Sequence, residues 1–270
     1  MTRVLLQGVL VFFAWVSLCQ AEQMRLAVTT SFHNSGLSEI LLPAIQSELG
    51  LNVQLLVVGT GQALRLGRAG DVDAILVHSR AAEEEFVTAG YGTHRREIMY
   101  NDFVFVGPSS DPAGIAQANK AVDALRAIAL LQAPFVSRGD DSGTHRKEQV
   151  LWRQAGLDPS DFGSWYRAVG SGMGAALNTG AGMNAYLMSD RASWRNFGNK
   201  SELALLFAGD PALFNQYTFI PVNPTLHGFV RHDLAMALEG WLVGEQSKAL
   251  IESFRIEGEK LFNFNAKGVD

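Results

Sequence analysis

The chain has 270 residues, of which 47% are hydrophobic, and its 22 basic and 27 acidic residues give a formal net charge of −5. This length and apolar content suffice for a large buried core and for more than one domain. The negative balance and the lack of a basic tract argue against nucleic acid or an anionic membrane surface as a partner, and a single cysteine excludes an internal disulfide bond.

Residues 1–21 have the composition of a secretory signal peptide. Arg3 supplies a short basic start, residues 4–18 are mostly apolar, and Ala21 ends a cleavage motif of small residues. We expect cleavage after Ala21, a periplasmic location and a mature net charge of −6, because Arg3 is the one charged residue removed. The alternatives are a membrane anchor, for which the segment is short, and lipidation of Cys19, which follows a leucine where such signals have a small residue.

Short apolar runs alternate with helical patterns along the rest of the chain. This order is typical of parallel α/β sheets. Strands are expected at residues 24–28, 53–58, 73–77, 98–106, 135–137, 203–207 and 217–222, with helices between them.

The length of this α/β region predicts two lobes. No linker rich in Pro, Gly and Ser separates them, so continuous strands should join the lobes. Two long extended runs near prolines, at residues 100–108 and 217–224, are the candidate crossover strands. We therefore expect lobe I to comprise residues 22–104 and 220–270, and lobe II to comprise residues 105–219.

Polar loops follow two of the strands expected in lobe I, and each precedes a helix. Thr30 and Ser31 come after the opening strand, and Gly59-Thr60-Gly61 comes after the next one. Ligands of open α/β sheets bind at the carboxyl ends of the strands. The glycines free backbone amides for contact with a ligand. Taken singly, each loop is equally explained as a helix cap or a tight turn.

The loop at residues 136–144 has the features of an anion site. It follows an apolar strand and precedes a helix, so its amides lie at the positive end of the helix dipole. Arg138 adds a permanent charge whose planar fork fits two oxygens of one oxyanion. Ser142 and Thr144 offer hydroxyl groups, and Gly143 allows close approach. A helix cap beside a surface arginine is the alternative explanation of this loop alone.

Many separated motifs together resemble the periplasmic tungstate-binding proteins of tungstate ABC importers, from about residue 25 to the end of the chain. The matching segments are Val28-Thr29-Thr30-Ser31, Asn34-Ser35-Gly36-Leu37, Val58-Gly59-Thr60-Gly61-Gln62-Ala63-Leu64, Leu66-Gly67-Arg68, Val77-His78, Gly90-Tyr91-Gly92, Met99-Tyr100-Asn101-Asp102-Phe103, Val106-Gly107-Pro108, residues 137–145, Lys147-Glu148, Gly172-Met173-Gly174 and Val222-Asn223-Pro224. Phe32-His33 departs from the pattern where small polar residues are expected, and Gly182-Met183-Asn184 replaces a more acidic stretch.

The resemblance implies a type II periplasmic-binding fold, in which two α/β lobes joined by two crossover strands close on one tetrahedral oxyanion. It implies capture of tungstate or molybdate, with no cofactor, and delivery to an ABC permease in the inner membrane. We expect a monomer without catalytic residues or a site for a metal cation. The ligand-binding residues would be Thr30, Ser31, Thr60 and Gly61 in lobe I and Arg138, Ser142, Gly143, Thr144, Ser171 and Gly172 in lobe II.

The anion loop also resembles that of phosphate-binding periplasmic proteins, in which an aspartate accepts the proton of hydrogen phosphate. Asp140 is the candidate for that role here, although we favour a structural role in which it holds Arg138 and caps the helix. A phosphate- or sulfate-type oxyanion-binding protein is therefore the alternative function, and the choice between tungstate and molybdate stays open.

A secreted hydrolase is the alternative from a different class. The segment around Ser142 lacks the Gly-x-Ser-x-Gly elbow, and His145 lies in the helix that follows the same loop, so it is not an independent base. The histidines show no His-Glu-x-x-His spacing, and Gly59-x-Gly61 lacks the rest of a dinucleotide fingerprint. The sequence therefore disfavours enzymatic, metal and dinucleotide sites.

Overall fold

The computed structural model describes residues 22–267. The expected signal peptide and Cys19 lie outside these residues. Within the described part of the chain, no helix is long and apolar enough to cross a membrane.

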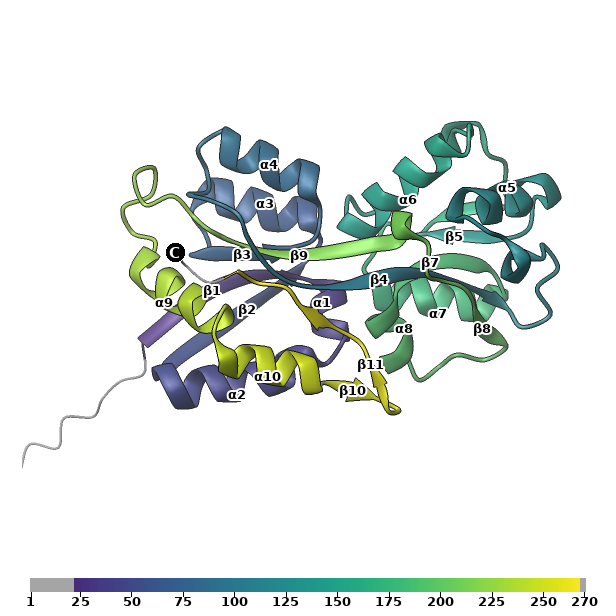
Figure 1. The fold of residues 1–270 in the computed structure, drawn as a ribbon. Helices are drawn as coiled ribbons and strands as arrows, with labels where there is room; N and C mark the ends of the chain where they lie inside the picture. Colours follow the sequence, from purple (N-terminus) through teal and green to yellow (C-terminus); the bar gives the residue numbers. More distant parts are fainter. Residues whose placement is uncertain (1–21, 268–270) are drawn as a thin grey trace, which may run out of the picture.

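Two α/β lobes are joined by two long strands that run through the centre of the molecule (Figure 1). Lobe I contains β1 (Glu22–Thr29), α1 (Thr30–Asn34), α2 (Leu37–Leu49), β2 (Leu51–Val58), α3 (Thr60–Ala69), β3 (Ala74–Val77), α4 (Arg80–Thr88), α9 (His232–Leu242) and α10 (Glu245–Ser253). The short strands β10 (Arg255–Ile256), β11 (Glu259–Lys260) and β12 (Asn263–Phe264) follow.

The strand β4 (Arg96–Pro108) leads into lobe II, and β9 (Phe214–Pro221) returns from it. Lobe II contains η1 (Ile115–Gln117), α5 (Ala121–Leu131), β5 (Phe135–Ser137), α6 (Gly143–Gln154), η2 (Pro159–Asp161), β6 (Tyr166–Ala168), α7 (Met173–Met183), β7 (Tyr186–Asp190), α8 (Arg191–Asn196), β8 (Leu203–Phe207) and η3 (Pro211–Leu213). The expected lobe boundaries after residues 104 and 219 fall inside β4 and β9 and stay a prediction.

The strands are ordered β2-β1-β3-β9-β4-β7-β5-β6, and β8 and β12 also pair with β4. Strand β1 is parallel to β2 and β3, and β5 is parallel to β6 and β7. The expected parallel pairing holds for these strands but not for the crossover strands, because β4 and β9 run antiparallel to each other and to the strands beside them. Strand β4 pairs with β9 up to Asp102 and with β7 from Phe103.

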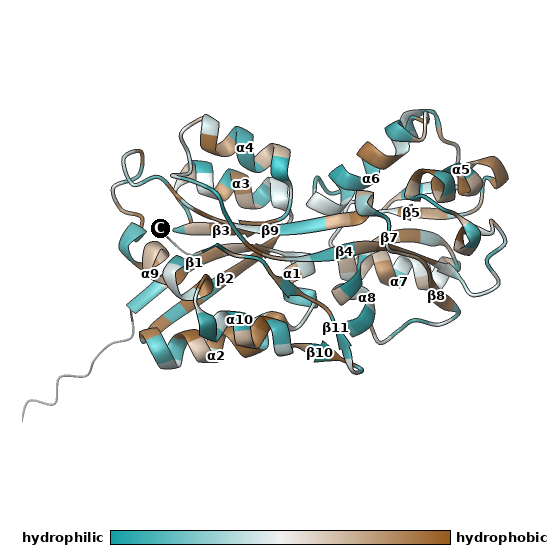
Figure 2. Cartoon of the chain, viewed as in Figure 1, coloured by the Kyte–Doolittle hydropathy of each residue, from teal (hydrophilic) through white to brown (hydrophobic). Residues whose placement is uncertain are grey.

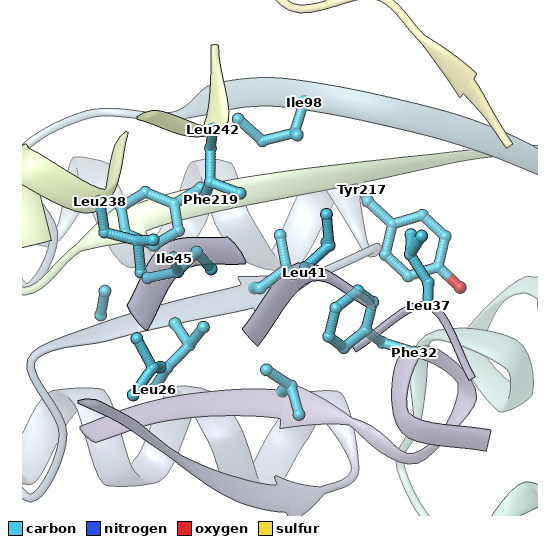
Figure 3. Close-up of a cluster of buried hydrophobic side chains, with 14 of the residues drawn as sticks. Leu26, Phe32, Leu37, Leu41, Ile45, Ile98, Tyr217, Phe219, Leu238 and Leu242 are labelled. Atoms are coloured by element: carbon cyan, nitrogen blue, oxygen red, sulfur yellow. The ribbon is translucent and has the colours of Figure 1, made fainter. Parts of the chain in front are cut away.

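Each lobe has apolar clusters on both faces of its strands. Hydrophobic residues are concentrated on the strands and on the helix faces that cover them (Figure 2). The largest cluster lies between the strands of lobe I and α2, α9 and α10, where Leu26, Leu41 and Leu238 are buried. Phe32 is part of the same cluster and packs beside Tyr217 (Figure 3). This departure from the family pattern therefore fills the core, while His33 beside it is exposed.

Seven expected strands are present with shifts of a few residues at their ends. The sequence predicted no strand at β6, at β7 or at the short strands β10, β11 and β12. The apolar run that forms β7 follows the glycine-rich helix α7 closely, so the sequence pattern does not distinguish the strand from the helix. Because β7 pairs with both β4 and β5, it connects the crossover strand to the loop that carries Arg138.

Candidate functional site

The loops of lobe I place Thr30 and Thr60 at the same edge of the sheet. The two residues begin α1 and α3, which start directly after the parallel neighbours β1 and β2. The Thr29 hydroxyl accepts a hydrogen bond of 3.2 Å from the Phe32 amide and caps α1. Thr30 is half-buried, and Ser31 and Thr60 are completely buried. Adjacent parallel strands thus bring three hydroxyl-bearing residues to one end of lobe I.

The anion loop of lobe II ends at the N-terminus of α6. Gly139 and Asp141 adopt positive φ angles of 64° and 56°, which turn the chain from β5 into the helix. The Ser142 hydroxyl accepts a hydrogen bond of 3.1 Å from the His145 amide, so Ser142 is the N-cap of α6. The Thr144 hydroxyl is buried and has no protein partner. The loop therefore combines a capped helix start with one free buried hydroxyl.

Arg138 is 2% exposed and lies between the two lobes. Its Nη2 donates to Thr30 Oγ1 over 3.0 Å and to Asp140 Oδ2 over 2.5 Å. Its Nη1 lies 3.5 Å from Ser31 Oγ, and its Nε has no protein partner. A buried guanidinium needs partners for its charge and its donors. Arg138 has one carboxylate partner and an unused donor, which suits it to an additional anion.

Two further hydrogen bonds join the lobes beside Arg138. The Gly143 amide donates to Thr60 Oγ1 over 3.0 Å, and the Gly61 amide donates to the Asp141 carbonyl over 3.2 Å. A Cβ atom on Gly143 would lie only 2.7 Å from the His78 ring, so this close approach requires glycine. The structure therefore shows the two lobes in contact, with the amides at the start of α3 and α6 facing each other.

The loop before α7 places Ser171 and Gly172 next to the site. Gly172 precedes α7, and a Cβ atom on it would lie 3.2 Å from Thr30 Cγ2. Ser171 is exposed, and its amide donates to the Arg138 carbonyl over 3.2 Å. The structure thus gathers nine of the ten expected ligand-binding residues around the interface, whereas the Ser171 side chain faces solvent. Their contact with a ligand stays a prediction.

Five further polar residues lie near the site and are not among the ligand-binding residues expected from the sequence. They are buried, each has at least one side-chain atom without a protein partner, and they come from the crossover strands and from the ends of β3 and β7: His78, Asn101, Asp190, Asn215 and Tyr217. The His78 and Tyr217 rings lie 4.9 Å apart. Burial, and then the charge of Arg138, lowers the pKa of His78 to about 3, so His78 is neutral. These groups add a polar layer behind Arg138.

Ser142 does not form a nucleophile–base pair with His145. Ser142 Oγ is occupied by the His145 amide, and His145 Nδ1 instead faces Ser137 Oγ at 3.1 Å. Asp140 is bound to Arg138, and its Oδ1 accepts from the Ser142 amide over 3.3 Å. Within residues 22–267, no group of three or more His, Cys, Asp and Glu residues is placed to hold a metal ion. The chemistry offered is hydrogen bonding to an anion.

Comparison with known proteins gives consistent matches to a family model, to a relative and to solved structures. A family model described as PBP superfamily domain matches residues 20–246. The tungstate-binding protein TupA of Peptoclostridium acidaminophilum is 43% identical over 245 residues, which cover 89% of this chain and 85% of the relative.

Two solved structures resemble the fold over nearly their whole length. The tungstate ABC transporter from Geobacter sulfurreducens aligns with a TM-score of 0.80 and 45% identity, covering 86% of this chain and 99% of that chain. The tungstate-binding protein TupA from Desulfovibrio alaskensis G20 aligns with a TM-score of 0.77 and 41% identity, covering 92% of this chain and 100% of that chain. The likeness therefore covers most of this chain.

Proposed function

We propose that this chain, which belongs to the PBP superfamily and to the family of the tungstate-binding protein TupA, captures tungstate for an ABC importer. The observation that carries the proposal is the buried Arg138, which is held between Thr30 of lobe I and Asp140 of its own loop. A tetrahedral dianion at this place would meet a fixed cation together with hydroxyl and amide donors from both lobes.

Closure of the lobes follows from the same geometry. An anion that contacts both lobes has a higher affinity for the closed form than for the open form, so it shifts the population to the closed form. The ligand-binding set of the proposal is the ten residues expected from the sequence. Neutral donors must make up most of this set, because one arginine alone compensates a buried dianion poorly.

Titration calorimetry of the ligand-free protein tests the assignment directly. Tungstate, molybdate, sulfate and phosphate would be titrated separately, and then in competition. We expect one tetrahedral oxyanion per chain, with tungstate or molybdate bound far more tightly than sulfate or phosphate. Tighter binding of phosphate than of tungstate would reject the assignment and support the phosphate-type alternative.

The finer parts of the function belong to the same proposal. The chain acts as a periplasmic monomer after removal of residues 1–21, presents the bound anion to an inner-membrane permease, and has no catalytic activity. The names of its relatives support a binding role rather than an enzymatic one. Mass determination of the secreted protein by mass spectrometry and light scattering would test the cleavage site and the monomeric state.

A further inference from the structure

Asp190 is a completely buried carboxylate at the end of β7. Its Oδ1 accepts a hydrogen bond of 2.9 Å from the Ser193 amide and caps α8. The Ser193 hydroxyl donates in turn to the Ser31 carbonyl over 3.3 Å, which ties this corner of lobe II to α1. Asp190 Oδ2 has no protein partner. One oxygen of Asp190 is therefore structural, and the other is available.

The charged and titratable groups that face Asp190 lie in the site. Arg138 acts electrostatically on the Asp190 carboxylate and also binds Asp140. Asp190 acts on Tyr217, whose pKa is raised well above its ordinary value, first by burial and then by this charge. The His78 ring lies 4.9 Å from the Tyr217 ring in a tilted arrangement, and His78 is neutral. Asp190 and Asp140 thus share one cation.

The charged groups on the other elements beside Asp190 are already paired. Arg191 of α8 donates to both carboxylate oxygens of Asp102 on β4, at 2.7 and 2.6 Å. Arg195 of α8 forms an ion pair of 2.5 Å with Glu259. Arg138 is the arginine whose charge stabilises the ionised form of Asp190, although it donates no hydrogen bond to that carboxylate.

Arrival of a dianion changes this balance. Two carboxylates and a dianion around one guanidinium would leave uncompensated negative charge in a buried site, which is costly. Burial is the main cause that raises the pKa of Asp190, whereas its bonds to Ser193 and the charge of Arg138 lower it. A dianion beside Arg138 adds repulsion and favours the neutral acid further.

We propose that Asp190 links capture of a proton-free oxyanion to the uptake of one proton from solvent onto its free oxygen. In the empty protein the ionised carboxylate shares Arg138 with Asp140. In the loaded protein Asp190 is protonated and neutral, so it no longer competes with the anion for the charge of Arg138. Asp190 acts through Arg138 and is a positioning residue. The inference rests on the proposed function, because it requires a dianion at Arg138.

Tungstate and molybdate carry no proton near neutral pH. The proton that Asp190 takes up on their capture must therefore come from the solvent.

The test measures protons directly. Tungstate is titrated calorimetrically at one pH in several buffers of different ionisation enthalpy, and the dependence of the observed heat on that enthalpy gives the number of protons taken up. The wild type should take up close to one proton. Its affinity for tungstate should therefore fall by up to about tenfold for each unit by which the pH is raised. Asp190→Asn retains the capping oxygen, and should take up almost no proton and bind with an affinity nearly independent of pH.

Two further variants serve as controls. Asp190→Ser keeps a capping hydroxyl and should lose the proton in the same way, which guards against a folding defect of the first variant. His78→Gln replaces a neighbour of Arg138 that is already neutral, and this variant should keep the uptake. Tungstate binding without proton uptake in the wild type, or uptake that persists in both Asp190 variants, would overturn the inference. A wild type that binds no tungstate would instead overturn the proposed function.

Discussion

Arg138 and Thr30 come from different lobes and are joined by a hydrogen bond of 3.0 Å between Nη2 and Oγ1. The guanidinium is fixed on its other side by Asp140. Such preorganisation reduces the side-chain entropy that binding would otherwise cost. Arg138 therefore stands at the centre of both ligand capture and lobe closure.

Replacement of this arginine should remove most of the affinity. Arg138→Ala is expected to weaken tungstate binding by at least about 2 kcal/mol, because a buried anion loses its charge-assisted partner. Titration calorimetry measures the change. Arg153→Ala, at an exposed position of α6, is the matched control and should bind as the wild type does. A folded Arg138→Ala protein with near-normal affinity would remove Arg138 from the site.

A methyl group on Gly143 should hinder closure without harming either lobe. Its Cβ would lie 2.7 Å from the His78 ring and 3.0 Å from the His78 carbonyl, and His78 is buried. Overpacking of this kind costs about 1–3 kcal/mol. Gly143→Ala should therefore weaken tungstate binding by roughly fivefold to a hundredfold, measured by calorimetry.

The matched control for this substitution is Gly182→Ala, because nothing lies within 4 Å of the added carbon. It should leave the affinity unchanged. Thermal unfolding of both ligand-free variants should stay close to that of the wild type. Unaltered affinity of Gly143→Ala would show that the loaded form does not bring Gly143 against His78.

Ser142 should matter for the stability of α6 and not for turnover. Its hydroxyl caps the helix, and loss of such a cap costs about 1 kcal/mol. Ser142→Ala should lower the free energy of unfolding by about this amount, measured by chemical denaturation. Neither protein should hydrolyse ester, peptide or phosphoester substrates. Reproducible hydrolysis that disappears in Ser142→Ala would establish an enzyme.

Local patterns located the hydroxyl-rich loops because strand, loop and helix follow one another within a few residues. Thr30 and Thr60 were expected at one edge, and the parallel pairing of β1 with β2 places them there. The direction of β4 and β9 was not predictable, because strand pairing across the lobes is a non-local property. The role of an isolated polar residue in an apolar strand, such as Tyr217, also cannot be predicted until the packing around it is known.

Asp190 is a second residue whose role the sequence predicts only in part. Its sequence context, an aspartate before a short helix, is typical of an N-cap, and it does cap α8. Only the fold shows that its second oxygen is buried near Arg138 without a partner. The sequence therefore predicted the part of the site that the loops form. It did not predict the part that the crossover strands and β7 form.

Glu148 should make the stability depend on pH independently of the ligand. This carboxyl group is buried in α6, accepts hydrogen bonds from the Tyr166 hydroxyl at 2.7 Å and the Trp152 indole at 3.2 Å, and burial raises its pKa from 4.5 to about 7. The folded state thus binds its proton more tightly than the unfolded state does. Stability from this group is present below about pH 4.5 and is lost as the pH rises towards 7.

The variant Glu148→Gln isolates this effect, because the amide stays neutral. The difference in unfolding free energy between variant and wild type should shift in favour of the variant by up to about 3 kcal/mol as the pH rises from 4.5 to above 7. Denaturant unfolding at several pH values in the absence of ligand measures it. A difference that does not change with pH would mean that Glu148 is ionised in the folded protein.

Asp140 decides between a metal oxyanion and phosphate. If Asp140 faced the ligand, its carboxylate would repel tungstate, so Asp140→Asn would strengthen tungstate binding, and hydrogen phosphate would lose a proton acceptor. The structure instead places Oδ2 on Arg138 and Oδ1 on the Ser142 amide, which is a structural role. Asp140→Asn should therefore cost about 0.5–2 kcal/mol of stability or affinity and leave the order of tungstate over phosphate unchanged. Competition calorimetry on both proteins measures this order. Tighter binding of phosphate than of tungstate by the wild type would contradict the tungstate assignment.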